Sequence, residues 1–189
     1  GTVQVKAPLR CAVGAANQWD DTTDQAAILD RWLIRRTVRP VSPQGEERLL
    51  FETLPTVTPV MTLADLDAVS VAAETLPLSD EAKAAYIQIR QELRQAGINP
   101  SNRRLRLSVS VVRAAAAIDG AAEVQPGHLE CLADVLWDDP SEQPEKCSEI
   151  VVRIANPVGA AVNELLREVD QVVREAVDAV TRTAAVKKL

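Results

Sequence analysis

No glycine in the sequence is followed by lysine, so the chain lacks the glycine-rich loop and lysine with which P-loop proteins hold phosphates. No apolar run reaches the roughly 18 residues that a membrane span needs, and we therefore expect no span. Aromatic residues make up only 3% of the chain, so the core must consist mainly of Ala, Val, Leu and Ile. Apolar residues nevertheless reach 47%, which excludes a disordered chain and favours closely packed helices.

The sequence also has few side chains that could act as a nucleophile or bind a metal ion. His128 is the one histidine, so any Ser-His-Asp or Cys-His site would have to include it. Its position in the first turn of an expected helix indicates a surface or half-buried residue instead. The three cysteines, Cys11, Cys131 and Cys147, have no CxxC spacing, which indicates reduced thiols in a cytoplasmic protein. No group of residues has the spacing of zinc ligands.

The charge of the chain restricts its partners. A net charge of −6 speaks against a non-specific nucleic-acid binder, which needs a basic surface, and we expect no nucleic-acid partner. We expect the acidic pair Asp20-Asp21 to cap a helix and the pair Asp138-Asp139 to lie in a solvated linker. The second pair follows an apolar stretch and so imitates a Walker B motif, but its position at the end of a helix speaks against that role.

The first 42 residues have the pattern of part of an α/β domain. The apolar run 9–16 ends at Asn17 and predicts a strand buried on both faces, as in a parallel sheet. Residues 21–36 predict a helix with an apolar face, and residues 37–41 predict an edge strand because they include a proline.

Helical patterns dominate from residue 43 onward. Thr62 and Ser79 are N-cap candidates, and Gly97 is a stop signal. Residues 103–119 alternate like a strand at first, but their length, the Ala114–Ala117 run and the flanking Asn-Pro-Ser and Gly favour a buried helix. The expected helices are 46–53, 62–75, 79–97, 103–119 and 126–137.

A polar linker at 138–144 precedes a long helix that we expect to begin near Val158. Its apolar residues recur at alternating spacings of three and four, which is the pattern of a short heptad seam. We expect this seam to be buried against another helix, in this chain or in a part of the protein outside it. The seam residues are Val162, Leu165, Val169, Val172, Ala176 and Ala179.

Four short motifs, in this order and spacing, resemble the MoxR family of AAA+ ATPases, closest to its RavA-like branch. Residues 15–17 (Ala-Ala-Asn) resemble the sensor at the end of a core strand. Residues 29–35 (Leu-Asp-Arg-Trp-Leu-Ile-Arg) resemble the motif of the next helix, with Trp where Phe or Met is usual. Residues 101–104 (Ser-Asn-Arg-Arg) resemble the start of the lid helix, and residues 136–137 (Leu-Trp) its closing helix. The resemblance covers roughly residues 7–140.

The resemblance implies a role for each of four residues. Asn17 would be sensor 1, which orients the attacking water or touches the γ-phosphate. Arg31 would be the arginine finger that reaches the neighbouring subunit's site. Arg103 would be sensor 2 on the lid, with Arg104 as the rival for that role. A neutral amide and fixed guanidinium groups suit phosphoryl transfer, which is catalysed mainly by positioning and charge neutralisation.

The resemblance also implies an organisation and a function. The expected fold is mainly α: residues 1–42 form the last part of an α/β AAA+ core, 43–140 an all-helical lid and 141–189 a helical extension. Because both Walker motifs are missing, we expect a fragment of an ATP-driven, chaperone-like remodelling or assembly factor. The intact protein would use ATP and Mg²⁺ in a homo-oligomeric, hexameric ring, with a possible von Willebrand A-domain partner.

The chain alone is expected to hold no nucleotide tightly and to hydrolyse none, because the phosphate-binding loop and the metal-binding acids are absent. Two other functions stay open at the level of sequence. One is a non-catalytic helical interaction module, in which the basic clusters pair with the abundant acids. The other is a regulatory subunit that completes the ATP site of a partner.

Overall fold

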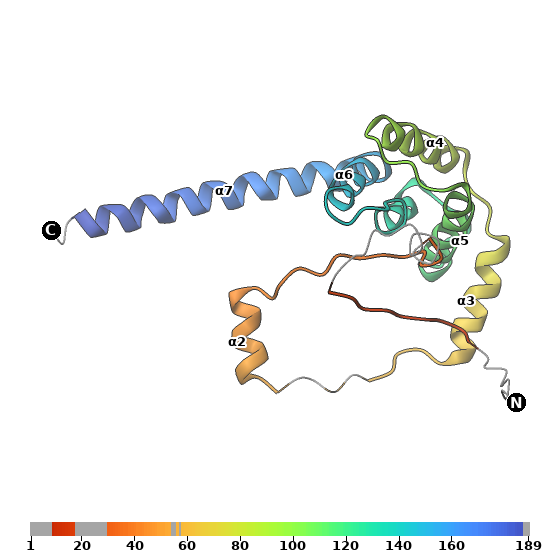
Figure 1. The fold of residues 1–189 in the computed structure, drawn as a ribbon, viewed down its shortest axis with the longest axis horizontal. Coiled ribbons are helices and arrows are strands. Elements are labelled where there is room, and N and C mark those ends of the chain that lie inside the picture. The colour runs from red at the N-terminus through yellow and green to blue at the C-terminus, as the bar shows by residue number, and fades with distance from the viewer. Residues whose placement is uncertain (1–8, 18–29, 54–55, 57, 187–189) are drawn as a thin grey trace, which may run out of the picture.

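The computed structural model describes residues 9–17, 30–53, 56 and 58–186. The described chain is mainly helical, as the sequence predicts (Figure 1). Its elements are α2 (Pro43–Phe51), α3 (Leu63–Thr75), α4 (Asp80–Gln95), α5 (Asn102–Ile118), the 3₁₀ helix η1 (Pro126–Asp134), α6 (Gln143–Ala155) and α7 (Pro157–Val186).

Several of the described helices begin at side-chain caps: Ser42 caps α2, and α3, α4 and α5 are capped at starts that the sequence predicts. Thr62, Ser79 and Ser101 each accept a hydrogen bond from a backbone N–H in the first turn, and Thr62 forms a reciprocal capping box. Gly97 and Gly120 follow α4 and α5 with φ values of +80° and +68°, which a residue with a Cβ adopts only at a cost. The predicted starts of these helices and their glycine stops are therefore confirmed.

One hydrophobic core joins α4, α5, η1 and α6. A parallel backbone bridge between Leu78 and Val124 joins the two segments that directly precede α4 and η1. Helix α6 was not predicted from the sequence; it belongs to this same core, so the packed part of the chain continues past residue 140 to Ala155. Core residues come from all four elements, and they include Ala82, Ile89, Leu93, Val112, Ala116, Leu129, Leu132, Leu136, Trp137, Cys147 and Val151.

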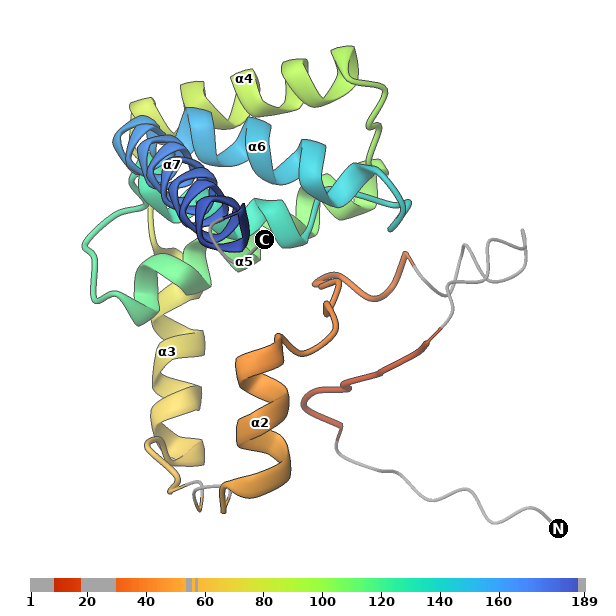
Figure 2. The ribbon, with the colours of Figure 1, turned by 90° about the vertical axis from the view of Figure 1, so that its left-hand side faces the viewer.

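The remaining helices lie at the edges of this body. Helix α3 packs along α5, α2 packs against none of the other described helices, and α7 leaves α6 and extends away from the body (Figure 1). Figure 2 shows α4 and α6 as neighbouring layers, with α2 and α3 on the opposite side. Within the described residues, no helix is both long and apolar enough to cross a membrane.

The heptad seam of α7 is not covered within the described chain. Val162, Leu165, Val169 and Val172 are between 50% and 64% exposed. The expected burial therefore has no partner among the described residues, and contact with a part of the protein outside this chain stays a prediction.

The first segments differ from the sequence-based expectation. Residues 9–16 and 37–41 form no strand, and residues 32–36 form no helix; most of the predicted helix 21–36 lies outside the described residues. A strand needs a partner for its backbone groups, and these described segments pair with none. Side-chain contacts anchor them instead: Arg10 pairs with Asp67 of α3 at 2.6 Å, and Arg39 pairs with Glu145 of α6.

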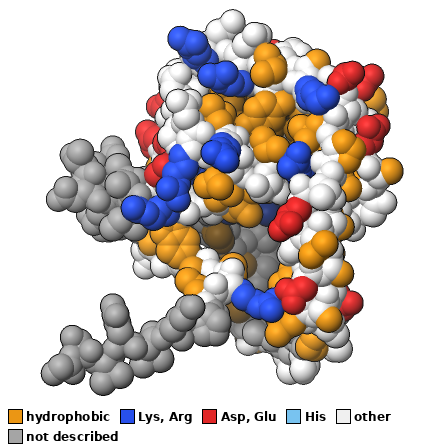
Figure 3. Space-filling view, turned by 90° about the vertical axis from the view of Figure 1, so that its right-hand side faces the viewer, with side chains coloured by type: hydrophobic (Ala, Val, Ile, Leu, Met, Phe, Trp, Pro, Cys, Tyr) orange, Lys and Arg blue, Asp and Glu red, His pale blue; other side chains and the backbone are white. Residues whose placement is uncertain are grey.

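Apolar side chains also reach the surface. Figure 3 shows one face on which they lie interspersed with several Lys and Arg side chains. On α3, the exposed large apolar residues are Leu63, Leu66 and Val71. Because α3 packs on α5 with few buried residues of its own, most of its apolar surface faces outward.

Candidate functional site

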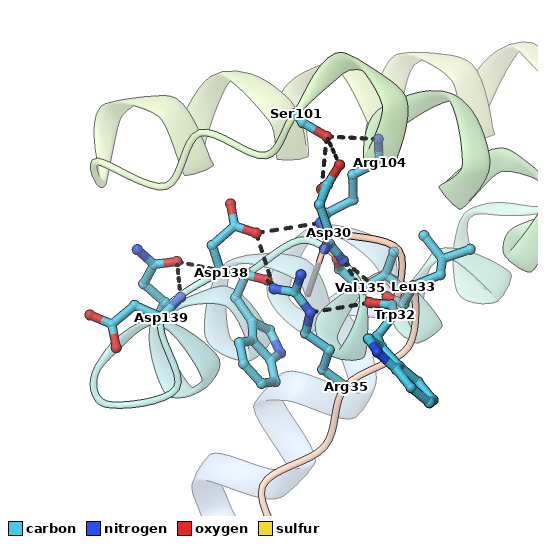
Figure 4. Close-up of polar contacts among 11 residues, drawn as sticks. Asp30, Trp32, Leu33, Arg35, Ser101, Arg104, Val135, Asp138 and Asp139 are labelled. Carbon is cyan, nitrogen blue, oxygen red and sulfur yellow. Dashed lines mark hydrogen bonds and ion pairs between the residues drawn. The ribbon is translucent and has the colours of Figure 1, made fainter. Parts of the chain in front are cut away.

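Two of the sequence motifs meet in the folded chain. Residues 30–35 dock where the first turn of α5 faces the end of η1, although they precede α5 by about seventy residues in the sequence. Ser101, the N-cap of α5, donates from its hydroxyl to both carboxylate oxygens of Asp30 at 3.0 and 3.2 Å (Figure 4). A third segment packs against them at Gly14. Its backbone lies beside the ring of Trp32, so closely that an added Cβ would be 3.3 Å from a ring atom.

Arg104 forms the centre of this docking site and is fully buried. Its Nη1 donates to three carbonyl oxygens, those of Leu33 and Val135 at 3.1 Å and that of Trp32 at 3.4 Å. Its Nη2 donates to Asp30 at 3.3 Å. Its Nε lies 3.4 Å from a carboxylate oxygen of Asp138, close enough for an ion pair but without hydrogen-bond geometry.

Arg35 is the second buried guanidinium of the site. Its Nη1 donates to the carbonyl of Trp137 at 2.9 Å and to Asp138 at 3.0 Å, and its Nε donates to the carbonyl of Trp32 at 3.2 Å. The guanidinium carbon also lies 5.8 Å from the centre of the Trp137 ring, within cation–π distance. The backbone N–H of Arg35 donates to the carbonyl of Asp134 at 2.8 Å, which fixes the main chain as well.

Asp138 is a half-buried partner of both arginines rather than a solvated linker residue, so that expectation was wrong. Burial raises the pKa of its carboxyl, the guanidinium of Arg104 lowers it, and the nearby carboxylate of Asp30 raises it again. The backbone N–H groups of Asp138 and Asp139 both donate to the side chain of Gln143 at the start of α6. The segment after Trp137 is therefore held in a fixed turn.

The two lid arginines lie in opposite environments. The guanidinium of Arg104 is buried and donates its hydrogen bonds to other groups of the protein, whereas the side chain of Arg103 is exposed. With Asn102, Arg106 and Leu107, Arg103 lines a surface concavity of about 570 Å³. This concavity is wide open, so it would need a second surface to enclose a ligand. Of the two, Arg103 is the one free to meet a phosphate from outside.

The other two candidate residues are also at the surface. Asn17 is exposed in the extended segment 9–17, and Arg31 is exposed in the turn that begins the docked segment 30–35. In the predicted helix 21–36, Arg31 and Arg35 would share a face at a spacing of four residues, but residues 32–36 are not helical and Arg35 is buried. The structure thus separates an outward arginine from an inward one four residues later.

Sequence reasoning missed the roles of Asp30, Arg35 and Asp138, which depend on contacts between distant segments. The inward direction of Arg104 did leave a signal. The buried face of α5 consists of residues spaced by four, Ser108, Val112 and Ala116, and one further step back reaches Arg104. Arg103 does not belong to this buried face, because it precedes Arg104 by one residue and so lies about 100° away around the helix.

Comparison with known proteins provides evidence that is independent of the geometry of the site. Residues 83–151 match the AAA lid domain family. The uncharacterized protein MJ0812 of Methanocaldococcus jannaschii is 26% identical over 171 residues, which cover 90% of this chain and 46% of that protein. The uncharacterized protein MJ0079 of the same organism is 27% identical over 135 residues, which cover 71% of this chain and 36% of that protein.

The chain therefore spans less than half the length of both relatives. The matched range runs from the first turn of α4 to the middle of α6, and it contains Arg103, Arg104 and most of the hydrophobic core. The helical fold agrees with this match. Residues 83–151 are thus similar to an AAA lid domain, and this match supports membership of the chain in the AAA+ family.

Proposed function

We propose that this chain is the sensor-and-lid part of a MoxR-type AAA+ ATPase that uses ATP to remodel or assemble other proteins. The observation that carries the proposal is the joining of two motifs: Asp30, from the motif of residues 29–35, binds Ser101 and Arg104 of the lid motif. A chance likeness of two short motifs gives no reason for their side chains to meet.

Three exposed residues would act on nucleotide in the intact protein. Arg103 stands at the N-terminal turn of α5, where the helix dipole already favours an anion, and would hold a phosphate of its own subunit. Arg31 would neutralise charge that develops in the neighbouring subunit's site. The amide of Asn17 would orient the attacking water.

The described residues fit only part of an ATP site. Exposed guanidinium and amide groups suit phosphate, but among residues 9–17, 30–53, 56 and 58–186 no group of three His, Cys, Asp or Glu could hold a metal ion. Bound ATP with Mg²⁺ would supply the γ-phosphoryl group that passes to water. The metal ligands and the phosphate-binding loop would belong to other parts of the longer protein.

The partners follow from the same proposal. An arginine finger serves a neighbouring site, so the intact protein would assemble into a homo-oligomer, which we take to be a hexameric ring. A partner with a von Willebrand A-domain is the one that the family resemblance implies.

Substitutions in the intact protein test the proposal. Arg31→Ala should lower ATP turnover by about 10³–10⁵-fold, because the transition-state charge loses its stabiliser. Nucleotide binding should change little, since the finger serves the neighbouring site. Arg103→Ala should slow turnover and weaken nucleotide binding together, because it contacts the nucleotide of its own subunit.

Two exposed arginines provide matched controls. Arg36→Ala removes an exposed guanidinium close to Arg31, and Arg94→Ala removes one from the last turn of α4. Both controls should keep normal turnover. Full turnover in both Arg31→Ala and Arg103→Ala would exclude the proposed function.

A second candidate is a non-catalytic interaction module, and the exposed apolar face of α7 favours it. Large apolar residues along that face, including Val158, Leu165 and Leu166, are more than half exposed. Such a face is suited to packing on another helix. Turnover that survives loss of both Arg31 and Arg103 would favour this candidate.

A further inference from the structure

We infer that Arg104 is a positioning residue for Arg31, because it holds both neighbours of Arg31, the side chain of Asp30 and the backbone carbonyl of Trp32, to the first turn of α5. The inference rests on the proposed role of Arg31 as an arginine finger. It assigns to Arg104 a task other than contact with nucleotide, and it gives Asp30 and Ser101 a share in that task.

The contacts on the two sides of Arg31 carry the inference. Before it, the carboxylate of Asp30 accepts from Ser101 at 3.0 Å and from Nη2 of Arg104 at 3.3 Å. After it, the carbonyl of Trp32 accepts from Nη1 of Arg104 at 3.4 Å and from Nε of Arg35 at 3.2 Å. Arg31 is therefore exposed between two anchored residues, which limits where its side chain can reach.

The burial of Arg104 makes this anchor stiff. A buried guanidinium is stable only when its charge and its donors are matched, and here Asp30 and Asp138 supply the negative charge. Its planar fork bridges a carboxylate on one side and backbone carbonyl groups on the other. A lysine ammonium is a single point with three donors and cannot span both, so Arg104→Lys should release the segment.

The same turn of α5 also carries Arg103, which the proposed function assigns to phosphate. Arg103 is exposed and Arg104 is buried against residues 30–33. A shift of this turn, when Arg103 gains or loses a phosphate, therefore moves Asp30 and Trp32 with it. In this way the nucleotide state of one subunit would set the position of the finger that the subunit offers to its neighbour.

Hydrogen exchange on the 189-residue chain tests the anchor without any nucleotide. The amide of Arg35 donates to the carbonyl of Asp134 at the end of η1, so it exchanges when the segment leaves its docking site between α5 and η1. Asp30→Asn and Arg104→Lys should each raise its exchange rate about tenfold or more, while the amide of Val112 in the core of α5 stays protected. Asp80→Asn, which loses only an exposed pair with Lys83, is the matched control and should change neither amide. Unchanged exchange at Arg35 in both test variants overturns the anchor.

Kinetics of the intact protein test the positioning role. Asp30→Asn should lower kcat for ATP by about ten- to a hundredfold with little change in KM, because the finger is misplaced rather than lost. In an Arg31→Ala background it should have no further effect. Provided that Arg31→Ala alone lowers turnover but leaves measurable residual activity, normal kcat in Asp30→Asn, or a further loss in that background, overturns the inference. Full turnover in Arg31→Ala instead overturns the proposed arginine-finger role on which the inference rests.

Discussion

Arg103 and Arg104 are consecutive residues of α5, yet Arg103 is exposed beside an open concavity while Arg104 is fully buried among backbone carbonyl groups and carboxylates. The helix turns by about 100° per residue, so neighbouring side chains point in different directions. This division gives one arginine to the surface and the other to the interior of the lid.

The stability of the chain should reflect this difference. Arg104→Ala should lower the free energy of unfolding by about 3–5 kcal/mol, because it leaves Asp30 and buried carbonyl groups without their partner. Arg103→Ala should change it by less than about 0.5 kcal/mol, as is usual for exposed positions. Urea unfolding followed by circular dichroism measures both. Equal stabilities of the two variants would contradict the buried network.

How far the sequence predicts the fold depends on whether a signal is local. The caps Thr62, Ser79 and Ser101 act within one helical turn, so the starts of three helices could be predicted correctly. Helix α6 was overlooked because its apolar residues, such as Cys147 and Val151, follow closely on a proline-containing polar stretch.

The candidate site could be predicted only in part. The motif of residues 29–35 was visible in the sequence, but its irregular backbone was not, because bonds from Arg104 to the carbonyl groups of Trp32 and Leu33 connect residues about seventy positions apart. The strand predicted for residues 9–16 is absent because an apolar run forms a strand only beside a partner strand, and the described residues provide none for it.

The three thiols should react in order of exposure. Cys11 is exposed, whereas burial raises the pKa of Cys131 to about 11 and that of Cys147 to about 12. Since the thiolate is the reactive form, iodoacetamide at pH 8 should label Cys11 first and Cys131 much more slowly. Cys147 should react only after unfolding. Mass spectrometry of peptides over time measures this, and early labelling of Cys147 would contradict its place in the core.

Helix α7 provides a test of the uncovered seam. Leu165 is 60% exposed, so Leu165→Asp should leave the stability of the isolated chain within about 0.5 kcal/mol of the wild type. In the intact protein the same change should weaken assembly, because a charge would be buried where the seam meets another helix.

Light scattering of the intact protein measures that assembly. Gln171→Asp, at an exposed polar position on the same helix, is the control and should assemble normally. Normal assembly of Leu165→Asp would mean that the seam of α7 takes no part in the assembly of the intact protein.

The most direct test of the central claim is a mixture of two inactive forms of the intact protein, one with Arg31→Ala and one with a disabled phosphate-binding loop. If Arg31 acts on the neighbouring subunit, mixed rings contain some sites with both a working loop and a working finger. ATP turnover by the mixture should then rise clearly above that of either parent, once subunit exchange has been demonstrated. A mixture that stays as inactive as its parents, or an Arg31→Ala protein that is active by itself, would contradict the claim that this chain supplies an arginine finger to its neighbour.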